Sequence, residues 1–257
     1  MNGGTTSAGH FCRRGVKLFV VESSFAVRIA EVYASIQGEG QFAGTPSVFV
    51  RTTGCNLRCW FCDTPFTSWK PEGPHVSVAD LVRQVREFDI NHVVLTGGEP
   101  LLQPDCVPLC EQLLTVGHFV TIETAGTVFR PAAASLMSIS PKLANSSPAR
   151  TGDADAARWH ARHEQSRSQP EVIAKLIAAG EYQLKFVVDQ PSDLAEIATY
   201  LSDWPQVPGD RVWLMPQARS REELQSRSDW LESEAVRLGY RFSSRWQIAQ
   251  FGNQRGK

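Results

Sequence analysis

The sequence predicts an α/β fold with a mostly parallel sheet. From residue 76 onward, short apolar runs alternate with segments whose apolar residues recur at helical spacing. Apolar strands separated by helices are typical of parallel sheets, because each parallel pair needs a crossover and the helices cover the sheet. Ligands of such sheets gather at the carboxyl ends of the strands. We therefore expect the chemistry in the loops that follow Val50, Leu95, Ile122 and Ile139.

The expected elements follow one another along the chain. A helix begins after Ser77, whose hydroxyl suits an N-cap, and its apolar face is formed by Leu81, Val82, Val85 and Phe88. The expected strands span residues 47–50, 93–96, 119–123, 137–140, 183–188 and 211–215. The other expected helices are one that begins near Pro104, where proline suits the first turn, and those at 171–179, 192–201 and 220–238.

The composition narrows the class of protein. The chain has 257 residues, with 26 Lys and Arg against 27 Asp and Glu, for a net charge of -1. This near-zero net charge argues against nonspecific electrostatic binding to nucleic acid or to an anionic membrane. No apolar run approaches the roughly 18 residues of a membrane-spanning helix. We expect no nucleic acid and no membrane as partner, but a small molecule in a local cleft.

The chain divides into unequal parts. We expect residues 1–24 to form a loose N-terminal extension. The apolar run within them is too short for a signal peptide, so we expect a cytoplasmic protein. Residues 25–257 are expected to form a single catalytic domain. Within that domain the polar segment 144–169 predicts a surface insertion, in which His160 and His163 would be solvated loop residues.

Three of the six cysteines form a C-x3-C-x2-C motif directly after the first expected strand: Cys55, Cys59 and Cys62. Three thiolates leave one metal position open, whereas a structural zinc site is normally closed by four protein ligands. Thiolates suit iron–sulfur chemistry, and a [4Fe-4S] cluster held by three cysteines has one iron free for another chelate. A zinc site completed by a further side chain is the alternative; the candidates are His75, His92 and Asp63.

The other three cysteines are not expected to take part in this chemistry. Cys106 and Cys110 lie four residues apart in an apolar helical pattern, which predicts two core positions. Cys12 lies in the N-terminal extension and has no evident role.

A second unusual loop follows the strand at 93–96. Its sequence is Thr96-Gly97-Gly98-Glu99-Pro100. Two glycines let the backbone approach a ligand closely, and a carboxylate beside them can accept hydrogen bonds from an ammonium group. Alone, this loop would be a turn with an exposed glutamate. Together, a three-cysteine loop after an early strand and a Gly-Gly-Glu loop after a later one are highly specific.

This combination resembles the radical S-adenosylmethionine (SAM) superfamily. The cysteine spacing matches the signature of that family, and Gly97-Gly98-Glu99-Pro100 is similar to its GGE motif. The resemblance implies a partial (β/α) barrel of mostly parallel strands, in which SAM chelates the open iron through its amino and carboxylate groups. The reduced cluster would cleave SAM to a 5′-deoxyadenosyl radical.

Further motifs narrow the resemblance. They are Ser35–Gly40, Arg51, Cys62–Thr64, Glu123–Thr127, Ser140–Ser146, Lys185–Val188 and Leu214–Pro216. In this order they resemble the 7-carboxy-7-deazaguanine synthase (QueE) family over residues 27–256. The resemblance implies a lyase that contracts 6-carboxy-5,6,7,8-tetrahydropterin to 7-carboxy-7-deazaguanine with release of ammonia, in queuosine and 7-deazapurine biosynthesis. SAM would be regenerated.

The resemblance also implies roles for individual residues. The substrate would be bound by Gln37, Gly38, Glu39, Gly40, Arg51 and Thr96. SAM would be bound by Gly97, Gly98, Glu99, Ser140 and Lys142. The cluster would be held by Cys55, Cys59 and Cys62, and Mg²⁺ would be positioned by Thr64. The residue types suit these roles. The amide of Gln37 and the carboxylate of Glu39 can form hydrogen bonds with the polar edge of a pterin, and Arg51 can bind a carboxylate through two N–H groups.

The remaining expectations concern the C-terminus and the partners. The run 245–256 resembles the closing strand of the family, with Gln247 where a histidine often stands. Glutamine does not titrate, so we expect hydrogen bonding there and no acid–base role. The resemblance implies an electron donor such as flavodoxin or ferredoxin, and a homodimer. The alternative functions are another radical SAM enzyme, such as a glycyl-radical activase, and a zinc-stabilised binding module.

Overall fold

The computed structural model describes residues 25–152 and 155–256. Its strands are β1 (Ala26–Ile36), β2 (Pro46–Thr52), β3 (His75–Ser77), β4 (His92–Gly97), β5 (Phe119–Thr124), β6 (Leu136–Ile139), β7 (Tyr182–Val188), β8 (Val212–Pro216) and β9 (Arg241–Phe242). Within these ranges the nine strands form one sheet in the order β3-β1-β2-β4-β5-β6-β7-β8-β9. Neighbours from β2 to β9 are parallel, and β1 is antiparallel to β2 and β3. The sheet does not close, which confirms the predicted α/β fold with a partial barrel of mostly parallel strands.

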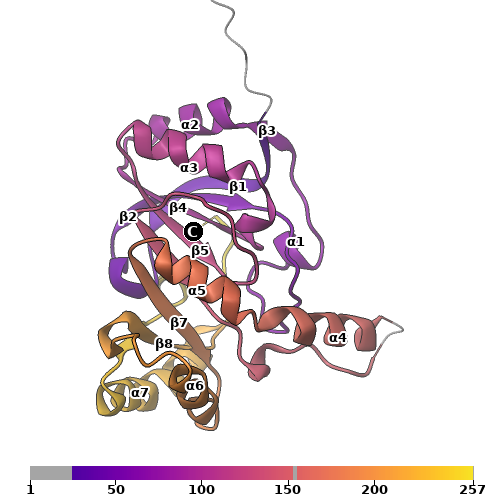
Figure 1. Cartoon of the computed structure of the whole chain (residues 1–257), viewed down its shortest axis with the longest axis vertical. Coiled ribbons are helices and arrows are strands. Elements are labelled where there is room, and N and C mark those ends of the chain that lie inside the picture. Colours follow the sequence, from indigo (N-terminus) through magenta and orange to yellow (C-terminus); the bar gives the residue numbers. More distant parts are fainter. Residues whose placement is uncertain (1–24, 153–154, 257) are drawn as a thin grey trace, which may run out of the picture.

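The helices are α1 (Pro65–Ser68), α2 (Val78–Glu87), α3 (Cys106–Thr115), α4 (Ala156–Arg167), α5 (Pro170–Ala178), α6 (Asp193–Ser202), α7 (Arg221–Leu238) and α8 (Trp246–Phe251). Short 3-10 turns are η1 (Gly40–Phe42), η2 (Pro100–Leu102), η3 (Ala144–Ser146) and η4 (Gly209–Arg211). Helices α2, α3, α5, α6 and α7 join successive strands and run along the sheet (Figure 1). None of the helices in the described ranges is long and apolar enough to cross a membrane.

The core lies between these helices and the central strands. Val93, Leu95 and Ile122 are fully buried, as the continuous apolar runs predict. Each such side chain stabilises the fold by roughly 1.5–3 kcal/mol relative to exposure. The predicted core positions Cys106 and Cys110 are confirmed, since both thiols are fully buried in α3.

The predicted start of α2 is also confirmed, because the Ser77 hydroxyl accepts a hydrogen bond from the backbone N–H of Asp80 at 3.1 Å. Leu81 and Val85 are fully buried. Phe88 is the exception on the predicted apolar face. It is 38% exposed because the helix ends at Glu87 and Phe88 lies at its C-cap.

The polar insertion differs from the expected solvated loop. Residues 156–167 form helix α4, and His163 is 1% exposed. The Nδ1 atom of His163 accepts the backbone N–H of Arg58 at 3.1 Å, so the proton is on Nε2, which lies 2.9 Å from the Ser146 hydroxyl. Burial lowers the pKa of His163 to about 4 and keeps the ring neutral. His160 is half-buried in the same helix, so the expectation was wrong for both histidines.

Two further segments were not predicted correctly. Strand β1 was missed, because its burial is mixed and shows no clean alternation of apolar and polar residues. The expected closing strand at 245–256 is wrong, since residues 246–251 form helix α8, whose first backbone N–H donates to the Gly38 carbonyl at 3.1 Å. Cys12 and the expected extension 1–24 lie outside the described residues.

Candidate active site

A cavity of about 500 Å³ lies at the carboxyl ends of the parallel strands. Residues from β1, β2, β4, β5, β7 and β8 line it, together with the cysteine loop and the C-terminal segment 252–256. This is the edge of the sheet where the sequence predicted the chemistry. Of the predicted site residues, those that line the cavity are Gln37, Gly38, Glu39, Arg51, Cys59, Cys62, Thr64, Thr96, Gly97, Gly98, Ser140 and Lys142. Those that do not line it are Gly40, Cys55 and Glu99.

The cysteine loop begins where β2 ends. Its three thiols are free and half-buried, and the backbone N–H of Leu57 donates to the Cys55 sulfur at 3.4 Å. Burial raises the pKa of Cys55 to about 12 and that of Cys59 to about 11, so neither thiol ionises readily without a bound cation. Free thiols of which two, Cys59 and Cys62, line the cavity fit an iron–sulfur cluster.

The zinc alternative lacks its extra ligand. Both ring nitrogens of His92 lie 2.8 Å from hydroxyls, those of Ser47 and Thr121, inside the core. Asp63 forms an ion pair with an arginine, and His75 lies on the edge strand β3. Among the residues that the structure describes, no three His, Cys, Asp or Glu side chains, the cysteines included, form a group that could hold a single metal ion, whereas in a [4Fe-4S] cluster each thiolate binds a different iron.

The Gly-Gly-Glu loop packs directly on the cysteine loop. The Glu99 backbone N–H donates to the Gly54 carbonyl at 2.9 Å. A Cβ at Gly98 would lie 2.2 Å from the Gly54 carbonyl oxygen and 2.9 Å from the Cβ of Cys55, so only glycine fits. The two loops therefore hold each other in place through backbone contacts, and Gly97 and Gly98 present their backbone to the cavity.

The Glu99 side chain differs from the expectation that it would meet an ammonium group directly. It is fully buried, and its carboxylate accepts hydrogen bonds from the Leu101 N–H, the Thr124 hydroxyl and the Ala125 N–H at 3.1, 2.8 and 2.8 Å. Burial raises the pKa of Glu99, and these donors oppose the shift. In this geometry Glu99 fixes the end of β4 against the end of β5.

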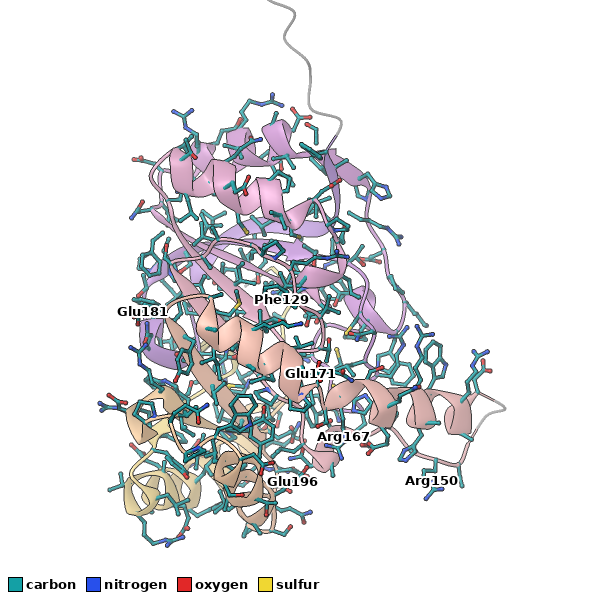
Figure 2. The ribbon with its side chains drawn as sticks, viewed as in Figure 1. Phe129, Arg150, Arg167, Glu171, Glu181 and Glu196 are labelled. Carbon is teal, nitrogen blue, oxygen red and sulfur yellow. The ribbon has the colours of Figure 1, made fainter. Side chains whose placement is uncertain are left out.

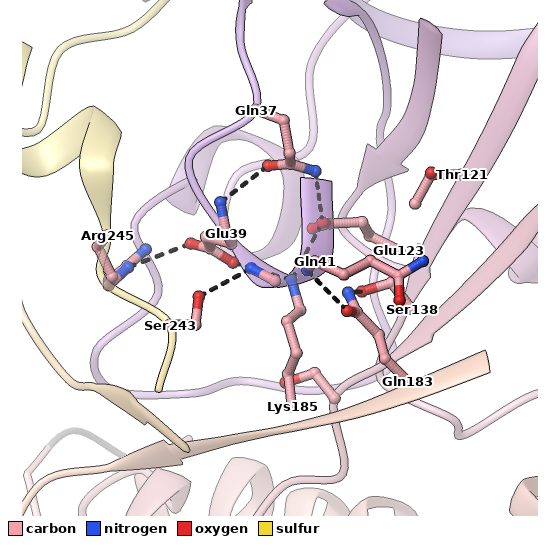
Figure 3. A network of polar contacts seen from close by, with 12 residues as sticks. Gln37, Glu39, Gln41, Thr121, Glu123, Ser138, Gln183, Lys185, Ser243 and Arg245 are labelled. Atoms are coloured by element: carbon pink, nitrogen blue, oxygen red, sulfur yellow. Dashed lines mark hydrogen bonds and ion pairs between the residues drawn. The ribbon is translucent and has the colours of Figure 1, made fainter. Parts of the chain in front are cut away.

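A buried ionic network forms one wall of the cavity (Figure 3). The Lys185 ammonium, 2% exposed, lies 3.0 Å from both Glu39 and Glu123. Arg245 contacts the other Glu39 oxygen at 3.2 Å and Asp63 at 2.5 Å. The network thus holds three carboxylates against two cations, an excess of one negative charge.

The amides of the network orient the carboxylates further. Gln37 donates to Glu123 at 3.1 Å, and Gln247 donates to Glu39 at 2.8 Å. Burial alone would raise the pKa of Glu39, but the charges of Lys185 and Arg245 outweigh it and lower that pKa. Glu39 is therefore an anion that can accept hydrogen bonds from a ligand. Gln247 has the hydrogen-bonding role that the sequence predicted.

The sequence did not assign Lys185, Glu123 or Arg245 to the site. From the sequence alone, Lys185 could be either a lysine at the edge of the sheet or a ligand for an anionic group. A signal was present, since Lys185 stands between Leu184 and Phe186 in an apolar strand. A lysine inside such a strand is almost never buried unless it is paired, so its position in the sequence implies carboxylate partners.

Arg51 ends β2 and faces the cavity. Its Nε donates to Glu31 at 2.7 Å and its Nη2 donates to the Tyr33 hydroxyl, both on β1. A guanidinium carries five N–H donors. Two of them fix its orientation here, and the carboxylate-binding role that the sequence predicted would fall to the others.

The remaining predicted residues also line the cavity. The Lys142 ammonium donates to the hydroxyl and the carbonyl of Ser140 at 2.7 and 2.8 Å. The Thr64 hydroxyl accepts from Thr67 at 3.2 Å, next to Cys62. The Thr96 carbonyl, at the end of β4, accepts a hydrogen bond from Thr52 at 3.1 Å.

Gly38 and Gly40 shape the turn that carries Glu39. Gly40 adopts φ 69°, and its N–H donates to the Ser243 hydroxyl at 2.8 Å, so its role is structural. A Cβ at Gly38 would lie 1.7 Å from Gln247 Oε1 and 2.9 Å from the Gln247 backbone nitrogen. The turn therefore packs against both the side chain and the backbone of Gln247 in helix α8.

Gly38→Ala is expected to push helix α8 away from the turn, because a new side-chain rotamer of Gln247 cannot relieve the clash with its backbone. We expect the KM for the substrate to rise roughly tenfold, equivalent to about 1.4 kcal/mol of binding. Val236→Ala is the control, since Val236 is 75% exposed on α7, away from the turn. Steady-state kinetics check the prediction, and an unchanged KM in the Gly38 variant would contradict it.

Comparisons with known proteins agree with this geometry. Residues 49–144 match the family model described as Radical SAM superfamily. The chain is 47% identical over 236 residues to 7-carboxy-7-deazaguanine synthase of Rhodopirellula baltica, covering 91% of this chain and 90% of the relative. It is 44% identical over 231 residues to the enzyme of that name from Halobacterium salinarum, covering 87% and 90%.

Among solved structures, QueE from Escherichia coli matches with a TM-score of 0.61 at 22% identity, covering 87% of this chain and 95% of that one. SuiB from Streptococcus suis bound to S-adenosylmethionine matches with a TM-score of 0.51 at 14% identity, covering 79% and 51%. At these identities the structures support the fold. The identity to the curated relatives over most of both chains shows that this chain belongs to the 7-carboxy-7-deazaguanine synthase family of radical SAM enzymes.

Proposed function

We propose that the chain catalyses the ring contraction of 6-carboxy-5,6,7,8-tetrahydropterin to 7-carboxy-7-deazaguanine with release of ammonia. The observation that carries the proposal is that the ion pairs of Lys185 with Glu39 and Glu123 line the same cavity as the cysteine loop. A pterin presents a row of N–H donors along its pyrimidine edge. Glu39, kept ionised by Lys185 and Arg245, can accept hydrogen bonds from that edge.

Arg51 is the positively charged residue proposed to bind the carboxylate of the substrate. An arginine held in place by Glu31 and Tyr33 can grip a substrate carboxylate with its other donors. The substrate would then lie between Arg51 and Glu39, which orients its ring relative to the cysteine loop. The turn Gln37–Gly40 and the end of β2 are thus proposed as the substrate-positioning elements.

The residues on the other side of the cavity would hold the cofactors. Cys55, Cys59 and Cys62 are proposed as ligands of a [4Fe-4S] cluster, and the backbone of Gly97 and Gly98 with Ser140 and Lys142 as the contacts for SAM. When bound, these cofactors supply the radical chemistry. The protein holds them against the substrate and excludes water, which Phe61 and Phe66 in the cavity lining would assist.

The proposal includes further features that the resemblance implies. Thr64 is proposed to contribute its hydroxyl to a Mg²⁺ site, which needs substrate oxygens and water to complete an octahedron. An electron donor, a homodimer and a cytoplasmic location belong to the same proposal. Free thiols and a cluster that must be reduced suit a reducing compartment.

Anaerobically reconstituted protein is expected to convert the carboxylated tetrahydropterin to the deazapurine in the presence of SAM and dithionite. Mass spectrometry would follow the product, and ammonia would be measured in parallel at one equivalent per product. SAM cleavage that proceeds equally without the pterin would contradict the substrate assignment. That outcome would favour another radical SAM enzyme, such as a glycyl-radical activase.

A further inference from the structure

A group of arginines and tryptophans covers the outer side of the cysteine loop. The Arg58 guanidinium lies 4.3 Å from the ring centre of Trp159 and 5.9 Å from that of Trp69. Arg158 and Arg162 approach the Trp159 ring at 5.2 and 5.8 Å. We name these five residues the Arg–Trp patch. It joins three segments: the cysteine loop, the residue that follows α1, and helix α4.

Helix α4 contributes Arg158, Trp159 and Arg162 to the patch, and polar contacts hold it next to the cysteine loop. In Figure 1 this helix projects away from the sheet, on the same side as α1. Figure 2 places Arg167 at its base, where this residue pairs with Glu164 and Glu196 at 3.0 and 3.3 Å. On its inner side, His163 accepts the Arg58 N–H. The helix is therefore attached to the residue between two of the proposed cluster ligands.

The loop side of the patch contacts the cysteine backbone directly. Arg58 donates to the carbonyl of Cys55 at 2.8 Å, and the Trp69 indole donates to the carbonyl of Cys59 at 3.3 Å. Trp69 is 39% exposed. A protein that docks on these side chains comes within one layer of side chains of the sulfurs. One-electron transfer falls steeply with distance, so this is a favourable place for a reductant.

The patch is positive although the chain is not. Arg158 and Arg162 are exposed, and Arg158 is paired with Asp155 at 3.1 Å. The whole chain has a net charge of -1, so this concentration of arginines is local. Arginine and tryptophan are the residue types that dominate binding energy at protein interfaces. A local positive field also speeds the encounter with an acidic partner.

We propose that the Arg–Trp patch is the docking surface for an acidic one-electron carrier protein. This inference rests on the proposed function, because only a redox cluster needs such a partner. The reduced carrier would lose one electron and the oxidised cluster would gain it, with no other bond made or broken. A small charged patch suits the limited contact area of transient redox complexes, whereas permanent homodimers use larger and more apolar interfaces.

The test compares two double charge reversals in the reconstituted holoprotein. Arg158→Glu with Arg162→Glu reverses the patch. Arg83→Glu with Arg237→Glu is the matched control, because both of these arginines are exposed on helices and, like Arg158, pair with an acid three residues away. The probe is a purified bacterial flavodoxin, whose binding is measured by titration at low and high salt.

The patch variant is expected to bind flavodoxin about tenfold or more weakly at low salt and to lose most of the salt dependence of the wild type. The control variant should bind within about twofold of the wild type, because its charges lie outside the patch. Turnover driven by dithionite should be unchanged in both variants, while turnover driven by reduced flavodoxin should fall only in the patch variant. The dithionite assay thus tests the proposed function separately.

Three outcomes would overturn the proposal. Equal weakening in both variants would show a general charge effect. Unchanged flavodoxin binding in the patch variant would place the carrier elsewhere. If sedimentation shows a dimer for the wild type and a monomer for the patch variant, this face would be a contact between two copies of the chain.

Discussion

Cys59→Ala is expected to yield protein that cannot retain an iron–sulfur cluster and has no turnover above background. Cys59 lines the cavity and stands between the other two proposed ligands in the sequence. Two cysteines cannot replace three, because each thiolate would ligate a different iron of the cluster. Anaerobically reconstituted wild type should contain about four irons per chain, as expected of this cluster type, and absorb in the visible range. The variant should lose both properties.

The matched control is Cys110→Ala, which removes a thiol from the core of α3. Its iron content, visible absorption and turnover should remain close to those of the wild type, because Cys110 is far from the cysteine loop in sequence and does not line the cavity. Circular dichroism would show that both variants are folded. Full iron content in the Cys59 variant would refute the assignment of that ligand.

Lys185→Met is expected to be the most destabilising change among the cavity residues that are not metal ligands. It removes the cation that pairs with Glu123 and leaves Glu39 with Arg245 as its remaining cation. Removing one partner of a buried ion pair costs about 3–5 kcal/mol, because the other charge remains uncompensated. Turnover should also be lost, since both carboxylates would move or take up protons. Chemical denaturation gives the free energy of unfolding.

Two controls separate the charge effect from a loss of packing. Lys70→Met removes an exposed lysine and should leave the unfolding free energy within about 0.5 kcal/mol of the wild type. Adding Glu123→Gln to Lys185→Met removes the charge left without its cation and should recover part of the stability, but not the activity. If Lys185→Met unfolds like the wild type, the ion pairs do not stabilise the fold.

The same network determines the expected dependence of stability on pH. The pKa of Glu39 is lowered in the fold, so its contribution is complete above the unfolded value of about 4.3 and is lost as the pH falls through the folded value. Burial alone would lower the pKa of Lys185, but its carboxylate partners outweigh burial and raise it. Its contribution is complete below about 10.4 and is lost at higher pH. In the Lys185 variant the folded pKa of Glu39 lies closer to the unfolded value, so the loss of stability on acidification should be smaller than in the wild type.

The parallel half of the fold was predictable because its residues carry local signals. Continuous apolar runs marked β4, β5 and β7, and Ser77 marked the start of α2 with a hydroxyl that does accept the expected N–H. The loops after those strands were predictable for the same reason. Once the strands are parallel, their carboxyl ends meet at one edge and bring the cysteine and glycine loops together.

The parts that failed depend on contacts between distant segments. Helix α4 is polar and has a single fully buried side chain, His163, whose partners lie in the cysteine loop and in η3. Helix α8 packs on Gly38, more than two hundred residues earlier in the chain. Lys185 is buried only because Glu39 and Glu123 approach it from other elements. The apolar neighbours of Lys185 signal that it needs partners, but no local pattern says which distant residues these helices and this lysine will contact.

The central claim is that three thiolates hold a cluster whose open iron binds SAM beside the carboxylate wall. Electron paramagnetic resonance of the dithionite-reduced protein, recorded with and without SAM, tests it most directly. The account predicts a cluster signal that changes shape when SAM is added and is absent in the Cys59 variant. A signal that is identical with and without SAM, at concentrations where SAM binds, would contradict it.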